Sequence, residues 1–303
     1  MYTFANPSMI SQLKDIWQEC FGDEMEYIDF FFDNILKKAP YYKNLLVALD
    51  GIAPVCMLTM IPAWIQLKSK KKKVYYIYGV ATTQSHRGRG YAAGLLAYAG
   101  ELAQKEDAAL MLVPASESLF TYYEKLGFAT GFYIKKETYD RKEENEKIYA
   151  KEKESNILKF SPTVQVSEIE EEAYFSLRMK QIKDVGDIYW EEEEIHYALL
   201  ENAFLGGKSY RITCEDVDYL LLGCPYDSCY YIREHTLPEN VAKEVFFFLA
   251  KQNQCSSISI KSKVSVLELQ QREPGNHIVP YGMILPKEAS AQIANGYLGL
   301  ALD

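Results

Sequence analysis

Residues 75–92, YYIYGVATTQSHRGRGYA, carry the clearest structural signal in the sequence. Residues 75–82 are rich in aromatic and β-branched side chains, which favour a β-strand, and Tyr91 opens an apolar segment of helical composition. The residues between these segments are polar and include two glycines. The sequence therefore predicts a strand, a glycine-bearing turn and a helix in direct succession.

The turn before the predicted helix suits a phosphate group. The first N–H groups of a helix have no partner within it, and the helix dipole adds positive potential at the same end. Gly88 and Gly90 lack the Cβ that would keep a phosphate from the backbone, while Arg87 and Arg89 supply positive charge. We therefore expect this turn to bind a polyphosphate ligand.

Two motifs in this region resemble a known family. Residues 87–92, RGRGYA, fit the pattern Arg/Gln-x-x-Gly-x-Gly/Ala, which resembles the coenzyme A pyrophosphate loop of the GNAT superfamily of N-acetyltransferases. Residues 119–128, LFTYYEKLGF, resemble the second signature of that superfamily, a helix that carries a tyrosine and closes with Leu-Gly-Phe. Nucleotide motifs fit less well, because the turn neither ends in Gly-Lys-Ser/Thr nor has the form Gly-x-Gly-x-x-Gly.

The resemblance implies an α/β GNAT fold, in which helices flank a mixed central sheet, and acetyl-CoA as co-substrate with no metal. It also implies which residues bind the coenzyme. The backbone after residue 79 of the central strand would pair with the pantetheine arm like an added strand. The implied set spans that strand, the loop, the helix start and the next loop: Val80, Ala81, Thr82, Arg87, Gly88, Arg89, Gly90, Tyr91, Ala92 and Ser116.

Amide formation from a thioester needs a neutral amine, a stabilised oxyanion and a proton for the leaving thiolate. By the resemblance, the Val80 N–H donates to the oxyanion. Tyr123 is the candidate general acid, because a phenol with a pKa of about 10 stays protonated at neutral pH. The sequence does not name the base: Ile77 stands where some family members carry a glutamate, and a water chain could end at Glu117, Glu24 or a backbone carbonyl.

Length, charge and composition narrow the kinds of protein that this chain can be. The 303 residues are enough for two domains, and the 48% hydrophobic content is ample for buried cores. The formal net charge of −9 argues against a nucleic-acid partner and mildly favours cationic partners such as amines. The six cysteines lack the paired spacing of a zinc site, and neither a signal peptide nor a long apolar run is evident. We therefore expect a cytoplasmic protein that does not bind membranes.

Other segments near the motifs have two readings. The predicted helix at residues 24–37 could line an acceptor pocket, or it could present an aromatic core face and a solvated acidic face. Its aromatic and acidic residues are Tyr27, Phe30, Phe31, Glu24, Glu26 and Asp29. Residues 68–73, KSKKKK, indicate a solvated hairpin turn, and His86 beside the loop indicates an exposed polar residue more than a catalytic one.

The second half of the chain repeats the plan of the first. Residues 140–159 are dense in Lys and Glu and predict a linker between a catalytic domain at residues 1–145 and a degenerate GNAT-like domain at residues 146–303. Residues 233–240, REHTLPEN, replace the glycine loop with a segment that has no glycine and two glutamates. We expect the second domain not to bind coenzyme A, and to serve packing, the acceptor-pocket wall or an oligomer interface.

Elements of the second half can be predicted from its apolar periodicity. Helices are expected at residues 166–182, 190–202 and 239–252, and strands at residues 209–214, 218–224, 229–235, 256–261, 277–285 and 297–303. The doubled plan is similar to the first two domains of the enhanced-intracellular-survival acetyltransferases, which add a third, sterol-carrier-like domain that we do not expect here. In that family the terminal carboxylate can reach the active site, which leaves open the same role for Asp303.

The sequence thus predicts an acetyl-CoA-dependent N-acetyltransferase that moves an acetyl group to a primary amine of a small molecule or peptide by direct attack in a ternary complex. The alternative is a non-catalytic acyl-CoA-binding or regulatory module, since the central strand has no carboxylate. A tandem-domain aminoacyl transferase of cell-wall synthesis would need a bulky acyl donor, and the intact coenzyme A loop argues against it. The aromatic helices allow a homodimer, and the amine itself is not predicted.

Overall fold

The computed structural model describes residues 1–36, 44–140, 164–270, 277–293 and 296–301. The first half of the chain follows the order that the sequence predicts, with the glycine turn between a long strand and a helix. Its elements are β1 (Tyr2–Phe4), α1 (Ile10–Phe21), α2 (Met25–Phe31), β2 (Leu45–Asp50), β3 (Ala53–Gln66), β4 (Lys71–Thr82), α3 (Tyr91–Lys105), β5 (Ala109–Leu112), α4 (Glu117–Lys125) and β6 (Ala129–Asp140).

The second half contains a similar succession of helices and strands. Its elements are β7 (Val164–Glu168), α6 (Glu171–Gln181), β8 (Ile188–Tyr189), α7 (Glu192–Phe204), β9 (Lys208–Cys214), β10 (Val217–Tyr226), β11 (Cys229–His235), α8 (Glu239–Gln252), β12 (Ser257–Lys263), α9 (Val266–Gln270) and β13 (Ile278–Leu285). Within the described part of the chain, no helix is both long and apolar enough to span a membrane.

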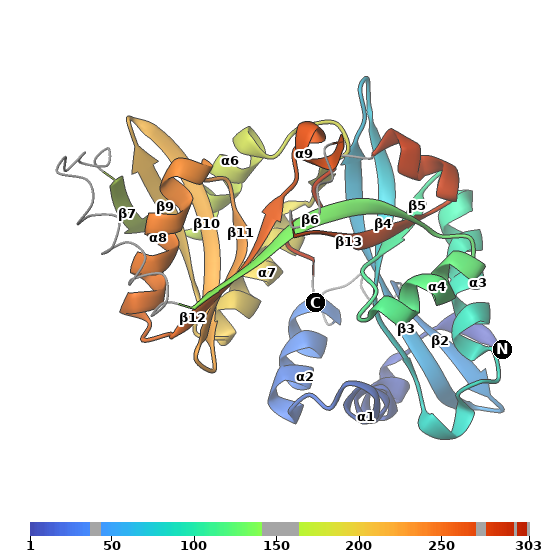
Figure 1. The fold of residues 1–303 in the computed structure, drawn as a ribbon. Helices are drawn as coiled ribbons and strands as arrows, with labels where there is room; N and C mark the ends of the chain where they lie inside the picture. Colours follow the sequence, from blue (N-terminus) through green and yellow to red (C-terminus); the bar gives the residue numbers. More distant parts are fainter. Residues whose placement is uncertain (37–43, 141–163, 271–276, 294–295, 302–303) are drawn as a thin grey trace.

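One mixed sheet joins the two halves. Its strand order is β1-β2-β3-β4-β5-β13-β6-β12-β11-β10-β9-β7, and β8 adds to β3. The pairs β4–β5 and β11–β12 are parallel, and the other pairs are antiparallel. Figure 1 shows β6 and β13 running between the two groups of strands, with helices against the sheet. The predicted fold class, a mixed sheet flanked by helices, is confirmed.

The place of β13 differs from the expectation for the second half. Residues 277–285 were expected to close the second domain, but β13 lies between β5 and β6, with Met283 opposite both Leu112 and Thr130. Strand pairing across the whole chain depends on non-local contacts, which local apolar patterns do not encode. The predicted linker falls largely in residues 141–163, outside the described residues, so the domain boundary stays a prediction.

Three local predictions were wrong. Residues 166–168 belong to strand β7, because Val164 and Val166 pack at the sheet edge beside β9. Residues 71–73 of the lysine run begin β4, where Lys73 pairs with Glu106 at 2.6 Å. Residues 297–301 are buried but form no strand; their backbone has isolated contacts with the segment around β8, as in the 3.0 Å bond from the Ile188 N–H to the Tyr297 carbonyl.

The sheet separates two cores in the first half. Because successive strand residues face opposite sides, Tyr75 and Ile77 pack under α3 and α4, while Tyr76 packs with Trp17 of α1 on the other face. The core on the α1 side continues into the second half through α7, whose Tyr197 belongs to it. The two halves therefore share a buried core on the face that carries α1 and α2.

Candidate active site

The strands β4 and β5 separate at the centre of the sheet. They pair in parallel as far as Tyr76 and Met111, after which β5 ends at Leu112 while β4 continues to Thr82. Among the described residues, the β5-facing edge of residues 77–82 therefore has no strand partner. An extended ligand can hydrogen-bond to such an edge as an added strand does.

A β-bulge lies on β4 at the same place. Met57 pairs with Ala81 and Thr59 with Tyr78, so Gly79 and Val80 together oppose one residue of β3. Gly79 has a φ of +63°, and a Cβ there would lie 2.9 Å from the Trp17 ring, so the position requires glycine. Bulges re-aim the backbone and are frequent next to active sites. The bulge thus places the backbone of Val80, the predicted oxyanion donor, in an irregular segment of the strand.

The glycine loop has the geometry of an anion site. Gly88 and Gly90 have φ values of +74° and +82°, and a Cβ on either glycine would meet no atom within 4 Å. The first helical bond of α3 joins the Gly94 N–H to the Gly90 carbonyl, so the N–H groups of Tyr91 and Ala92 precede the helical bonding pattern. An open, left-handed loop at a helix start fits a pyrophosphate group.

The charged residues of the loop differ in their contacts. Arg87 braces the loop, because its Nε donates to the Thr82 carbonyl at 3.1 Å. Arg89 is exposed. The Nδ1 of His86 lies 2.9 Å from the Thr83 hydroxyl, and its Nε2 lies 3.4 Å from Asp50. These contacts give His86 a structural role in fastening the turn.

A cavity of about 1040 Å³ opens beside the bulge and is lined by both halves of the chain. Gly79 and Val80 of β4 and Tyr123 of α4 line it, together with residues of α7, β10, β11 and β12. The loop residues 87–92, Ala81, Thr82 and Ser116 are not part of its lining. The structure therefore brings together Val80 and Tyr123 and keeps the loop outside this cavity, at the end of β4.

Tyr123 is almost fully buried, and its ring lies edge-on to Phe128 and Tyr122. Within the described residues its hydroxyl has no hydrogen-bond partner. Burial, with a smaller contribution from Tyr122, raises the pKa of Tyr123 to about 12, so the phenol keeps its proton at neutral pH. Ser116 is the exposed residue before α4, and its Oγ lies 3.0 Å from the Ser118 Oγ.

Some acidic and aromatic residues of the α2 region line the cavity, and the others form contacts elsewhere. Glu24, Glu26 and Tyr27 line the cavity, as the pocket reading predicts. Asp29 instead forms a 2.6 Å ion pair with Lys14, and the remaining two aromatic residues pack in ring clusters of the core. Glu117, the other carboxylate considered for a proton relay, does not line the cavity.

Glu201 of α7 was missed by the sequence reasoning. It is only 3% exposed and lines the cavity. Its Oε1 accepts a 2.6 Å hydrogen bond from the Tyr27 hydroxyl, and its Oε2 lies 2.5 Å from Arg233 Nη2. Burial, followed by Tyr78 and Glu201, raises the pKa of Tyr27 far above its ordinary value. No local signal marks Glu201, because its partners come from α2 and β11.

In the second half, the place that matches the glycine loop is closed. After β11 and β12 stop pairing at Ile232, the His235 Nε2 lies 2.8 Å from the Ser262 Oγ and bridges the two strands. Glu234 is fully buried and bonds to Arg178 at 2.9 Å. The strand gap that opens in the first half is therefore occupied by side chains in the second.

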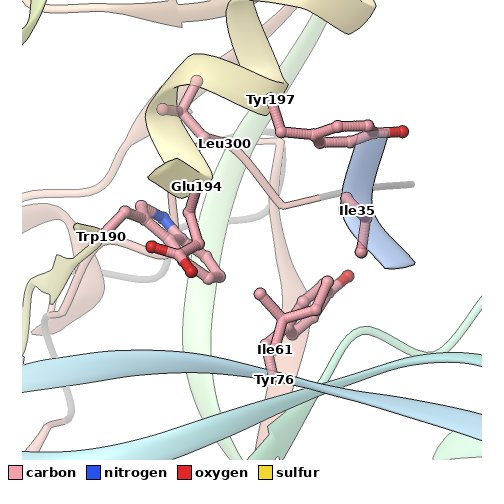
Figure 2. Close-up of a pocket in the computed structure, with 7 residues that line it drawn as sticks. All are labelled: Ile35, Ile61, Tyr76, Trp190, Glu194, Tyr197 and Leu300. Atoms are coloured by element: carbon pink, nitrogen blue, oxygen red, sulfur yellow. The ribbon is translucent and has the colours of Figure 1, made fainter. Parts of the chain in front are cut away.

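Behind the main cavity, the halves meet at a smaller cavity of about 20 Å³, enough for roughly one water molecule. Figure 2 shows Trp190 and Glu194 of the second half facing Tyr76 and Ile61 across it. Leu300 lines both cavities, and Ala301 lines the large one. The predicted role of Asp303 lies outside the described residues.

Comparisons with known proteins agree with the fold. Residues 2–131 match the family described as "Acetyltransferase (GNAT) domain", and no curated protein matches the sequence. A GCN5-related N-acetyltransferase from Anabaena variabilis aligns with a TM-score of 0.67 and 16% identity over 96% of this chain and 74% of its own. Eis1 from Mycobacterium abscessus aligns with a TM-score of 0.62 and 9% identity over 94% and 73%.

A shorter relative covers the chain from end to end. A putative acetyltransferase from Pyrococcus horikoshii aligns with a TM-score of 0.57 and 15% identity over 100% of this chain and 94% of its own. At these identities the likeness concerns the fold. The chain therefore has the fold of these GNAT proteins, and its residues 2–131 match a GNAT acetyltransferase domain, a domain type that uses acetyl-CoA as co-substrate.

Proposed function

We propose that this protein transfers the acetyl group of acetyl-CoA to a primary amine of a small molecule or peptide within a ternary complex. The observation that carries the proposal is that β4 continues through residues 77–82 after its pairing with β5 has ended, beside the cavity that Val80 and Tyr123 line. The glycine loop at the end of the same strand suits the pyrophosphate. The coenzyme would supply an activated acetyl thioester.

The coenzyme-binding residues follow from the same geometry. The backbone of residues 80–82 would bond to the pantetheine arm, and the N–H groups at the start of α3 would bind the pyrophosphate, with charge from the two arginines. Ser116 would border the arm where α4 begins. The residues assigned to this role are Val80, Ala81, Thr82, Arg87, Gly88, Arg89, Gly90, Tyr91, Ala92 and Ser116.

The chemistry rests on two groups of the first half. The N–H of Val80 would donate to the carbonyl oxygen as negative charge develops on it, which is the moment at which a fixed donor lowers the barrier. The hydroxyl of Tyr123 would protonate the departing thiolate, and its raised pKa keeps the proton available. We assign the end of the proton relay from the amine to Glu24, since it lines the cavity and Glu117 does not.

The second half would serve as the acceptor wall. Glu201, Arg233 and Tyr231 line the same cavity as Val80 of the β4 bulge, and the contact between His235 and Ser262 across the strand gap beyond Ile232 argues against a second coenzyme there. The division near residue 145, a cytoplasmic location and a homodimer stay predictions.

Thiol release from acetyl-CoA tests the proposal, with a panel of monoamines, diamines and amino acids as acceptors. Amine-dependent release of CoA is the expected result. Calorimetric binding of acetyl-CoA without release for any amine would favour the non-catalytic acyl-CoA-binding module. Absence of both binding and release would reject both functions.

A further inference from the structure

Three basic residues stand in a row on the wall of the large cavity. They are Lys136 on β6, Lys261 on β12 and Arg233 on β11, and all three line the cavity. Lys136 and Lys261 are direct partners in the antiparallel ladder between β6 and β12. Ile232 pairs with Ile260 in the parallel ladder of β11 and β12, so the residues that follow them, Arg233 and Lys261, are neighbours too.

The row lies on the face of the sheet from which an acceptor can approach. Side chains two residues apart on a strand share a face, so Lys136 is on the side of Ile134. Ile134 belongs to the core that contains Trp17 of α1, whereas Tyr123 belongs to the core under α3 and α4. The basic row is therefore on the α1 side, across the sheet from the helix that follows the glycine loop.

The positive charge of the row calls for an explanation. Like charges directly opposite each other on neighbouring strands repel, and this pair of lysines occurs in a chain with a formal net charge of −9. The Arg233 charge is balanced by Glu201 at 2.5 Å. The ammonium of Lys136 is exposed and forms no ion pair with another described residue, and Lys261 Nζ lies 5.5 Å from the Tyr281 ring centroid.

The opposite side of the cavity carries the contrasting charge. Asp23 and Glu24, between α1 and α2, and Glu26, in the first turn of α2, line it. A cavity with acids on one side and a basic row on the other matches a molecule that carries both charges. An ordinary solvated lysine face gives no reason for the three bases to align across three adjacent strands of a cavity wall.

We propose that the acceptor carries an oxyanion, a carboxylate or a phosphate, that binds to the row of Lys136, Lys261 and Arg233 while its amine lies toward Val80 and Tyr123. This inference rests on the proposed amine acetylation and names the substrate class. The acceptor is then an amino acid, a peptide end or a phosphorylated amine, and a simple polyamine is a poorer substrate.

The sheet order sets the length of this acceptor. Because β5 and β13 lie between β4 and β6, β6 is three strand spacings, about 14 Å, from β4, the strand that carries Val80. The side chain of Lys136 spans part of that gap. An acceptor with several bonds between its amine and its oxyanion fits the remainder, and one with adjacent groups does not reach both ends.

Three acceptors of one length test the proposal. They are 6-aminohexanoate, 6-aminohexyl phosphate and the neutral 6-aminohexan-1-ol, which share the amine and the chain and differ in the far end. We expect kcat/KM to be about tenfold higher for at least one anionic acceptor than for the alcohol. The anionic acceptor with the higher kcat/KM shows whether the site prefers a carboxylate or a phosphate. In Lys136→Gln and Lys261→Gln, the ratio of that anion to the alcohol should fall toward one.

The matched control is Lys135→Gln. Lys135 is the neighbour of Lys136 on β6 but faces the other side, where it lies 3.5 Å from Glu137 and outside the cavity lining. The Lys135→Gln variant should keep the wild-type ratio of kcat/KM between the anionic acceptor and the alcohol. Equal kcat/KM for all three acceptors would overturn the oxyanion site and leave the transferase assignment intact. A loss of acetyl-CoA affinity in Lys136→Gln would also overturn it, because the row would then belong to the coenzyme.

Binding measurements without catalysis test this inference separately from the proposed function. If no amine releases thiol, the transferase assignment fails, and the three acceptors are titrated calorimetrically into the protein saturated with free CoA. Tighter binding of the anions than of the alcohol, lost in Lys136→Gln and kept in Lys135→Gln, supports the site in that case. Equal or absent binding of all three overturns it.

Discussion

The Tyr27 hydroxyl donates a 2.6 Å hydrogen bond to the Glu201 carboxylate and so ties α2 of the first half to α7 of the second. The two residues are 174 positions apart in the sequence. Both line the large cavity, so this contact fixes the distance between its two walls. The proposed acceptor side of the cavity is therefore built by tertiary contacts between the halves.

Tyr27→Phe should destabilise the protein. The change leaves a buried carboxylate with one donor fewer, which costs about 1–3 kcal/mol of unfolding free energy. Urea denaturation measures the change. Tyr226→Phe, at an exposed tyrosine of the same cavity, should change the unfolding free energy little. Equal stability of both variants would show that the bond does not hold the halves together.

Tyr123→Phe should lower kcat by about a hundredfold and leave acetyl-CoA affinity almost unchanged, since a general acid acts only in the chemical step. Tyr122→Phe, the adjacent phenol on α4, is the control and should keep most of the rate. The raised pKa of Tyr123, about 12, gives a second readout. The acid is protonated below that value, so the wild-type rate should not fall through loss of this proton as the pH rises to about 10. A Tyr123→Phe enzyme with wild-type kcat would remove the residue from the mechanism.

Gly79→Ala should disrupt the β4 bulge. The substitution combines a φ of +63° with a Cβ 2.9 Å from Trp17, and we expect a loss of about 2 kcal/mol or more of unfolding free energy together with loss of coenzyme binding. Gly51→Ala isolates the clash, because Gly51 has a similar φ of +61° but open space around the Cβ position. Similar losses in both variants would mean that packing against Trp17 is not what requires glycine.

His235 should make the fold sensitive to acid. Burial beside Phe246 lowers the pKa of His235 to about 4, whereas the unfolded chain keeps the ordinary value near 6.5. The unfolded state binds the proton first, so stability is complete above about pH 6.5 and is lost as the pH falls toward 4. From these two pKa values we expect a loss of about 2 kcal/mol of unfolding free energy between pH 7 and 5, measured by urea denaturation.

His235→Gln should abolish this part of the pH dependence, because glutamine does not titrate. His277→Asn is the control, at an exposed histidine, and should keep it. An unchanged pH profile in His235→Gln would assign the acid sensitivity to other groups.

Much of the fold could be predicted from the sequence, because its signals are local. The alternating aromatic residues of β4, the glycine turn and the apolar face of α3 lie within residues 75–105, and β11 and α8 have the predicted bounds. The place of β13 could not be predicted, since Met283 meets Leu112 and Thr130 only after the halves have folded together.

In the candidate site too, some residues could be predicted from the sequence and others could not. The loop glycines and Tyr123 stand in local motifs, and their positions in the structure follow the motif order. Glu201, Lys136 and Lys261 carry no motif, because their significance depends on which strand or helix lies opposite. The sequence predicts a strand at residues 297–303, but the described part, 297–301, forms none, since apolar content does not distinguish a paired strand from a buried irregular segment.

The central claim is that the glycine loop binds coenzyme A. Calorimetric titration of acetyl-CoA into the wild type and Gly90→Asp tests it most directly, because the variant places a carboxylate where the pyrophosphate would lie. Gly51→Asp is the control, since it makes the same change at another left-handed glycine in open space. We expect a Kd of about micromolar order for the wild type and Gly51→Asp and no measurable binding for Gly90→Asp. Equal affinity in all three proteins, or no binding by the wild type, would contradict it.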